Sequence, residues 1–118
     1  MEMKPEKVFE MPFSKLYPLW VAKAGRKGRT QAETDAVICW LTGYREEELA
    51  ALADSAVTCG AFFRNAPRPN PNRSRITGMV CGVRVEEIQD PLMREIRYLD
   101  KLIDELAKGW PLEKIFRS

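Results

Sequence analysis

Hydrophobic residues recur at three- and four-residue intervals over residues 91–108, and charged residues occupy the positions between them. This spacing places the apolar side chains on one face of an α-helix. Asp90 directly before Pro91 is typical of a helix start, because aspartate caps free amides and proline is favoured at the first helical position. Gly109 supplies the stop. We therefore predict one long amphipathic helix in the last third of the chain.

Shorter helices are predicted earlier in the chain from the same spacing and from capping residues. Thr30 and Glu33 form a capping box for a helix that reaches Thr42, and Gly43 then ends it. With Ser14 and Thr58 as further candidate caps, the pattern predicts helices over 14–24 and 45–53, one turn through 58–63 and a last turn over 111–117.

Residues 76–84 have two interpretations. Every third or fourth residue from Ile76 to Val83 is apolar, which is helical spacing, whereas the short run GMVCGVRV is also typical of a strand. We favour the helix. It would place Gly78 and Gly82 one turn apart, where they would allow close packing against another helix. The strand stays open as the alternative.

Together these elements predict an all-α fold. The chain of 118 residues has an ordinary single-domain size. We expect a compact single-domain bundle of five to six helices over residues 13–118, preceded by an extended or partly disordered arm over residues 1–12. Residues 64–75, RNAPRPNPNRSR, are expected to form an ordered loop that joins two helices.

Composition narrows the chemistry. The sequence has no histidine, which excludes the serine–histidine and cysteine–histidine catalytic arrangements and the histidine-based zinc sites. Cys39, Cys59 and Cys81 are far apart in sequence, so they predict reduced thiols and no four-cysteine zinc site. Apolar runs are too short for a membrane span, and the first residues lack a signal-peptide pattern. We expect a cytoplasmic protein with no membrane contact, metal or cofactor.

Charge is unevenly distributed, although the net charge is only +2. Residues 64–84 contain five arginines and no acidic residue. Arginine favours paired hydrogen bonds to carboxylate or phosphate, and the amides at a helix start attract anions. The alternative is that most of these arginines pair with carboxylates inside the protein. The favoured binding site is an anion site at the expected helix start, formed by Asn72, Arg73, Ser74, Arg75 and Arg84.

Glu95 is the anomaly of the long helix. At about 100° per residue it falls inside the apolar stripe, between the positions of Leu102 and Leu106. A carboxylate in that place needs a charged partner, and we expect an arginine, Arg84 or Arg75 first. The structural interpretation is a buried salt bridge. The catalytic alternative is a small enzyme in which Glu95 acts as acid or base on an anionic substrate held by arginine.

Nucleic-acid binding is a weaker alternative. Lys23, Arg26, Lys27 and Arg29 form a basic strip around the sequence GRKGR, and the arginine block would extend it. A solvated turn between two helices is the favoured explanation of this strip. Nucleic acid is therefore not the expected partner.

Six stretches of the sequence resemble one bacterial family: YPLWVAKA, KGRT, WLTGY, FFRNAP, ITGMVCGVRVEEI and DPLMREIRYLDKLIDELAKG. They follow the family's order from about Met11 to Arg117. The family is catalogued as domain of unknown function 2200, and the resemblance implies a single compact bacterial domain with no known activity or cofactor. The tail WPLEKIF is less polar than the family's, which points to an apolar patch at Trp110 and Phe116 for contact with a second copy.

The function that these observations favour is a non-catalytic binding or interaction module with an arginine-lined site. Its ligand would be a small anion or an acidic partner. Catalytic turnover would have to rest on carboxylate, lysine, tyrosine or cysteine side chains, and Glu95 is the candidate among them.

Overall fold

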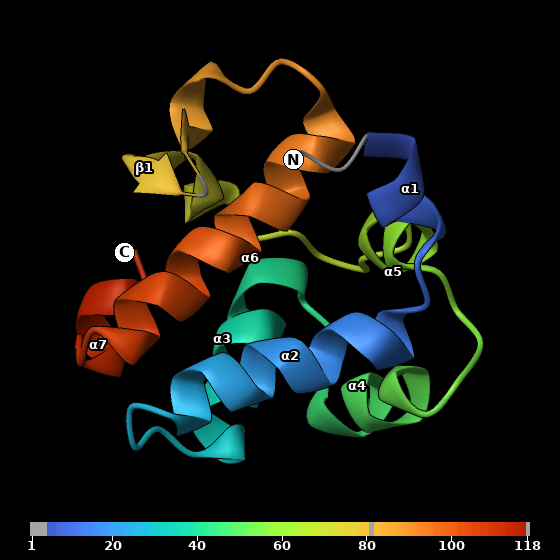
Figure 1. The fold of residues 1–118 in the computed structure, drawn as a ribbon, viewed down its shortest axis with the longest axis horizontal. Helices are drawn as coiled ribbons and strands as arrows, with labels where there is room; N and C mark the ends of the chain where they lie inside the picture. Colours follow the sequence, from blue (N-terminus) through green and yellow to red (C-terminus); the bar gives the residue numbers. More distant parts are fainter. Residues whose placement is uncertain (1–4, 81, 118) are drawn as a thin grey trace.

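The computed structural model describes residues 5–80 and 82–117, and helix α6 (Pro91–Ala107) runs through its centre (Figure 1). The Asp90 side chain accepts hydrogen bonds from the amides of Leu92 and Met93, as expected of an Asp-Pro helix start. Helices from both halves of the chain pack against α6. The predicted long helix is therefore confirmed, and the rest of the molecule is arranged around it.

The predicted all-α class is confirmed, with one small two-stranded hairpin added to it. The described helices besides α6 are α1 (Pro5–Glu10), α2 (Phe13–Gly25), α3 (Gln31–Thr42), α4 (Glu46–Ala53), α5 (Cys59–Arg64) and α7 (Leu112–Ile115). The 3-10 turns η1 (Pro71–Arg75) and η2 (Val85–Glu87) flank the strands β1 (Met79–Val80) and β2 (Val83–Arg84). Within the described ranges, no helix has both the length and the hydropathy that a membrane span requires.

Helix α1 replaces the extended arm that was predicted, although the first four residues of that arm lie outside the described part. The described part of this helix begins at Pro5, and proline is tolerated in the first turn of a helix. Phe9 packs against α5 so closely that a side chain at Gly60 would come within 3.1 Å of it. The amide of Cys59 also donates to the carbonyl of Met11, at 2.7 Å. Contact with α5, which local sequence does not reveal, thus fixes this segment.

Helix α2 differs from its prediction at its start. Pro12 precedes its first turn, so Ser14 lies inside the helix and does not cap it. Trp20 and Ala24 are buried. The side chain of Leu19, in contrast, is 61% exposed. An unpartnered apolar side chain therefore stands at the margin of this helix.

Helix α3 has both of its predicted ends. The Thr30 hydroxyl accepts a bond from the amide of Glu33 (3.1 Å), and the Glu33 carboxylate accepts one from the amide of Thr30 (2.9 Å). Gly43 follows with a φ of 80°, in the left-handed region that favours glycine. A Cβ at Gly43 would come within 2.5 Å of the carbonyl oxygen of Arg68. The arginine- and proline-rich loop therefore lies directly on the end of α3.

Main-chain hydrogen bonds hold this loop in place. The amide of Arg68 donates to the carbonyl of Thr42 (3.1 Å), and the amide of Asn70 donates to that of Leu41 (3.0 Å). These bonds satisfy carbonyls at the end of α3 that have no partner within the helix. The loop then enters η1, where the Asn70 side chain accepts a bond from the amide of Asn72 (2.9 Å).

The segment predicted as a helix over residues 76–84 forms an antiparallel hairpin instead. Met79 pairs with Arg84 across its two strands. Gly78 and Gly82 have φ values of 107° and 83°, which an α-helix cannot contain. The predicted packing of these glycines in a helix is therefore wrong, because both serve to turn the main chain.

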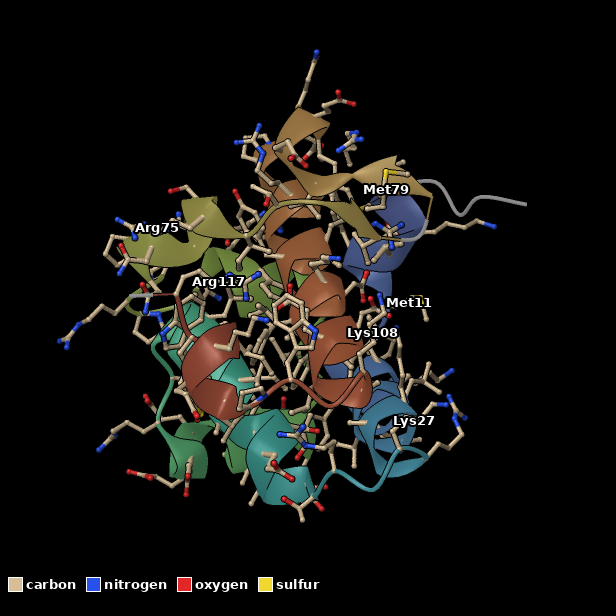
Figure 2. All side chains as sticks on the ribbon, turned by 90° about the vertical axis from the view of Figure 1, so that its left-hand side faces the viewer. Met11, Lys27, Arg75, Met79, Lys108 and Arg117 are labelled. Carbon is tan, nitrogen blue, oxygen red and sulfur yellow. The ribbon has the colours of Figure 1, made fainter. Side chains whose placement is uncertain are left out.

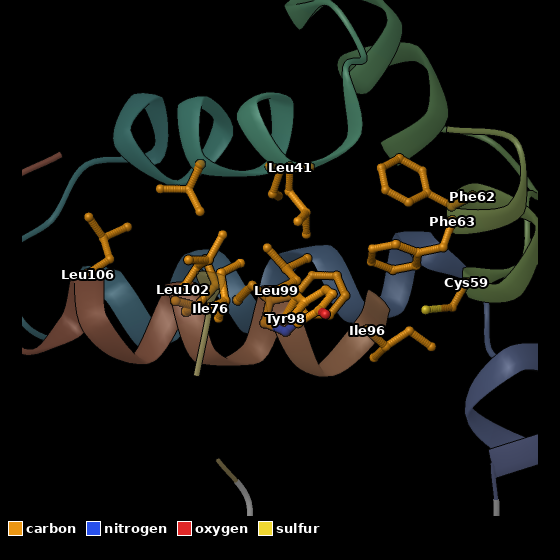
Figure 3. Close-up of a cluster of buried hydrophobic side chains, with 14 of the residues drawn as sticks. Leu41, Cys59, Phe62, Phe63, Ile76, Ile96, Tyr98, Leu99, Leu102 and Leu106 are labelled. Atoms are coloured by element: carbon orange, nitrogen blue, oxygen red, sulfur yellow. The ribbon is translucent and has the colours of Figure 1, made fainter. Parts of the chain in front are cut away.

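Apolar side chains from α2, α3 and α5 meet those of α6 in one core (Figure 3). Phe13 and Phe62 stack within this core, with ring centroids 3.8 Å apart. Leu41 of α3 and Leu99 of α6 are buried between these two helices (Figure 3). The spacing of apolar residues along α6 thus predicted its buried face correctly.

An ion pair between α6 and the segment after α7 holds the end of the chain in place. Glu105 of α6 is 1% exposed, and the Arg117 guanidinium donates to both of its carboxylate oxygens, at 2.6 and 2.7 Å. Phe116 stacks on Trp40 of α3, with centroids 5.8 Å apart. The rings of Trp110 and Phe116, expected to form an apolar patch, are both half-buried in contacts within the chain.

We expect Thr34→Val to raise the free energy of unfolding by about 1 kcal/mol. The Thr34 hydroxyl is buried in α3 and forms no hydrogen bond with the described residues, so folding removes it from water without compensation. Valine has nearly the same shape and no polar atom. Urea denaturation of the two proteins checks this, and Thr34→Ser, which keeps the hydroxyl, should not be more stable than the wild type.

Candidate functional site

Arg73 and Glu95 meet in an ion pair between η1 and α6. The Arg73 Nε donates to both carboxylate oxygens of Glu95, at 2.8 and 3.1 Å, and its Nη1 donates to the carbonyl of Asn70 at 2.9 Å. Both side chains are partly exposed, at 30% and 23%. Glu95 thus has a partner from the arginine block, as predicted, but the partner is Arg73 instead of Arg84 or Arg75.

The helix start that was expected to hold an anion does not exist. Residues 71–75 form the single 3-10 turn η1, and Ile76 after it is extended. The capping residue is Asn70, not Asn72 or Ser74. Ser74 and Arg75 are exposed at the end of this turn. Asn72, Arg73, Ser74 and Arg75, predicted to surround one helix terminus, therefore lie along a short turn.

Arg84 lies apart from the other predicted residues, in a hollow beside the hairpin. This hairpin hollow has a volume of about 510 Å³. Arg84 is exposed, and its pairing with Met79 places the two side chains on the same face of the hairpin. Asn72, Arg73, Ser74 and Arg75 do not line it. The lining residues are Met79, Gly82, Val83, Arg84, Glu87 and Ile88.

Polar contacts attach the hairpin to the rest of the fold. The amide of Gly78 donates to the Glu86 carboxylate at 3.0 Å, and the Lys101 ammonium of α6 donates to the carbonyl of Met79 at 3.2 Å. Hydrogen bonds from main-chain amides lower the pKa of Glu86, and the charges of Arg84 and Lys101 act in the same direction. The walls of the hollow are therefore held in a defined position.

The basic strip is partly used inside the molecule. The Arg29 guanidinium donates to the carbonyl of Trp110 at 2.9 Å and to the Glu33 carboxylate at 2.7 and 3.0 Å. The ammonium of Lys23 lies 3.7 Å from Asp104. Arg26 and Lys27 remain exposed in the turn after α2. This arrangement does not favour nucleic-acid binding, because Arg29 has a structural task.

A polar cluster between α2 and α3 was not predicted. The Tyr17 hydroxyl donates to the Asp35 carboxylate at 2.5 Å and accepts a bond from the Gln31 amide at 2.9 Å. Burial and the contact with Asp35 raise the pKa of Tyr17 to about 12. The three residues come from two helices, so no local spacing marks them. A phenol held in its neutral form connects these helices but is a poor base at neutral pH.

The surroundings of the two described cysteines, Cys39 and Cys59, disfavour the reactive thiolate form. Burial raises the pKa of Cys39 to about 11 and that of Cys59 to about 12, and neighbouring carboxylates add to the effect. A protonated thiol is a weak nucleophile. Cys81 lies outside the described residues. Nor does any group of three acidic or cysteine side chains among the described residues come together as a metal site would require.

Stability should fall as the pH rises from about 9 to about 12, because the folded protein retains the proton of Cys59 over this interval. The ordinary pKa of the thiol is 9.0, so the unfolded chain loses this proton first. The native state then binds more protons than the unfolded state, and unfolding is favoured. Urea midpoints between pH 7 and 11 measure the slope. Cys59→Ala should reduce it, and an unchanged slope in that variant would contradict the assignment.

Comparison with known proteins places the chain among bacterial proteins of unknown activity. The uncharacterized protein SP1917, known from its crystal structure, is 46% identical, and the likeness covers 97% of this chain and 93% of that one, with a TM-score of 0.92. No curated protein matches the chain. The sequence pattern of a family described as uncharacterized protein conserved in bacteria matches residues 7–117. The chain therefore belongs to this family, DUF2200.

Proposed function

We propose that the protein is a non-catalytic binding module that takes an anionic group, such as a carboxylate, against Arg84 in the hairpin hollow. The observation that carries this proposal is a contrast between two arginines. Arg73 is already bound to Glu95, whereas Arg84 is exposed and forms no ion pair with the described residues. This narrows the predicted anion site to one arginine and the surface around it.

The composition of the hollow supports a small ligand of low charge. Met79, Val83 and Ile88 contribute apolar surface beside the guanidinium, and an arginine in such surroundings binds carboxylates through two parallel hydrogen bonds. The Glu87 carboxylate also lines the hollow. It would repel a second negative charge, so a carboxylate should bind better than a doubly charged phosphate.

The groups that catalysis would use have structural roles instead, which supports binding without turnover. Glu95, the candidate acid or base, accepts two hydrogen bonds from Arg73. Such a contact holds the carboxylate in a fixed position. The thiols of Cys39 and Cys59 are held protonated.

Titration with acetate at constant ionic strength should shift the amide resonances of residues 82–88 and raise thermal stability. At an acetate concentration tenfold above Kd the stabilisation would be about 1.4 kcal/mol. Arg84→Ala should abolish both effects. Arg26→Ala removes the same charge from another exposed arginine and should leave them unchanged.

The same titration is repeated with phosphate and with an acidic peptide. The comparison distinguishes binding of a free anion from binding of a carboxylate on a partner protein. Arg73→Ala is unsuitable as a test, since it would break the ion pair with Glu95 and destabilise the fold. The proposal is contradicted if acetate and the acidic peptide both leave residues 82–88 unperturbed, or if Arg84→Ala responds like the wild type.

A further inference from the structure

A second hollow, separate from the hairpin hollow, lies between α1, α2 and α6. Its volume is about 340 Å³, in the range of ligand pockets. Met11, between α1 and α2, is one of its walls (Figure 2). This surface is called the α2 groove below. Its apolar lining consists of Val8, Met11, Leu16, Leu19, Trp20 and Ile96.

The floor of the α2 groove is fixed and its polar atoms are paired. The Trp20 Nε1 donates to one oxygen of Asp100 at 2.9 Å, and Arg97 donates to the other oxygen at 2.9 Å. The indole is 7% exposed, so it is held within the core while it also lines the groove. A partner that enters the groove therefore meets a preformed apolar surface, and ordering this surface costs little on binding.

The charged residues that α2 places beside the groove are basic. Lys15 and Lys23 stand four residues before and four residues after Leu19, so all three share one face of α2. Helix α2 contains no acidic residue. Lys23 reaches Asp104 only at 3.7 Å, and Asp104 forms its shorter contact, 3.0 Å, with Lys108. The exposed leucine is thus bracketed by two lysines at regular spacing.

We propose that the α2 groove docks an amphipathic helix of a partner protein, in which a large apolar residue is flanked by acidic residues four positions before and after it. The apolar side chain would enter the groove beside Leu19. The two carboxylates would then face Lys15 and Lys23, and because the spacing is symmetric, either helix direction satisfies it.

A second copy of this chain is a poorer occupant. Helix α4 and the residue that follows it do present exposed acidic residues at the required spacing, Glu46 and Asp54. The residue between them is Ala50, whose methyl group is too small to fill a hollow of about 340 Å³. The geometry therefore favours a different protein that carries a leucine or a similar side chain at the central position.

Three synthetic peptides of about 20 residues test the proposal, because isolated helices shorter than about 12–15 residues are marginal in water. They share a central leucine and differ only at the two flanking positions, which are glutamate, glutamine or lysine. Binding is measured by calorimetry and mapped by amide chemical shifts. The glutamate peptide should bind at least about tenfold more tightly than the lysine peptide, and the shifts should centre on Leu19 and Trp20.

Two variants assign the contact to the groove. Leu19→Glu should fold, because position 19 is 61% exposed and the new carboxylate lies one turn from two lysines. It should lower the affinity for the glutamate peptide by at least about tenfold. Met79→Glu changes the other exposed large hydrophobic residue of the described part and should leave the affinity unchanged. Lys15→Glu should shift the preference toward the lysine peptide.

Several results would overturn the proposal. The pairing of the partner's carboxylates with Lys15 and Lys23 would be contradicted if no peptide bound. It would also be contradicted if the glutamate and lysine peptides bound equally well. Sedimentation that shows a dimer lost in Leu19→Glu would assign the groove to a second copy. Binding to phosphatidylserine vesicles that is lost in the same variant, without binding of the glutamate peptide, would assign it to a membrane surface. The Arg84→Ala protein should bind the peptides normally, so failure here is distinguishable from failure of the anion site.

Discussion

Replacing Arg117 by methionine should lower the free energy of unfolding by about 3–5 kcal/mol, because a buried carboxylate would lose its partner. Glu105 is 1% exposed, and its two oxygens receive two short hydrogen bonds from this one guanidinium. Methionine retains much of the apolar stem but donates nothing. Urea denaturation followed by circular dichroism measures the loss.

Two further variants separate the ion pair from general effects at this end of the chain. Lys114→Met removes an exposed cation that lies 4.5 Å from the centre of the Trp110 ring, and we expect less than about 1 kcal/mol. The double variant Glu105→Met/Arg117→Met removes both charges and should recover most of the lost stability. If the double variant were as unstable as Arg117→Met alone, the ion pair would not be the cause.

Gly43→Ala should cost about 3 kcal/mol or more, from two sources that add. The φ of 80° strains alanine by about 1–2 kcal/mol. The added Cβ would also lie 2.5 Å from the carbonyl oxygen and 2.6 Å from the Cβ of Arg68, which forces the loop away from α3. Overpacking of this kind costs about 1–3 kcal/mol more.

Gly28→Ala is the matched control for this substitution. Gly28 has nearly the same φ, 83°, but a Cβ there would meet nothing within 4 Å. It should therefore show the strain alone, about 1–2 kcal/mol. The difference between the two variants measures how firmly the loop lies on α3, and equal losses would mean that the loop yields without cost.

The helices with strong end signals were predictable from sequence, and the reason is that those signals act locally. The capping box at Thr30, the left-handed Gly43 and the Asp-Pro start of α6 all function within one turn of chain. The helix predicted over 76–84 was wrong because apolar spacing alone cannot distinguish a helix from a hairpin. Gly82 was the better signal, since a glycine between two short runs that contain valine favours a hairpin turn.

The site was harder to predict, because its contacts join residues far apart in the chain. The sequence correctly required a partner for Glu95, yet the choice of Arg73 depends on the 3-10 turn that follows Asn70. Nothing in the sequence pattern predicted that Glu105 is buried. It lies outside the main apolar stripe of α6, and it is buried only because α7 and Arg117 cover that side.

The proline-rich loop over residues 67–71 also affects whether another chain can add to this surface as a strand. Between Pro67 and Pro71 only Arg68 and Asn70 possess an amide hydrogen, and both amides are bonded to the carbonyls at the end of α3. The three prolines have none to give. An extended segment on the surface would ordinarily be a template on which another chain could add as a strand and begin to aggregate. Here no main-chain donor is left over, so the loop protects the molecule against such growth while it closes the end of a helix.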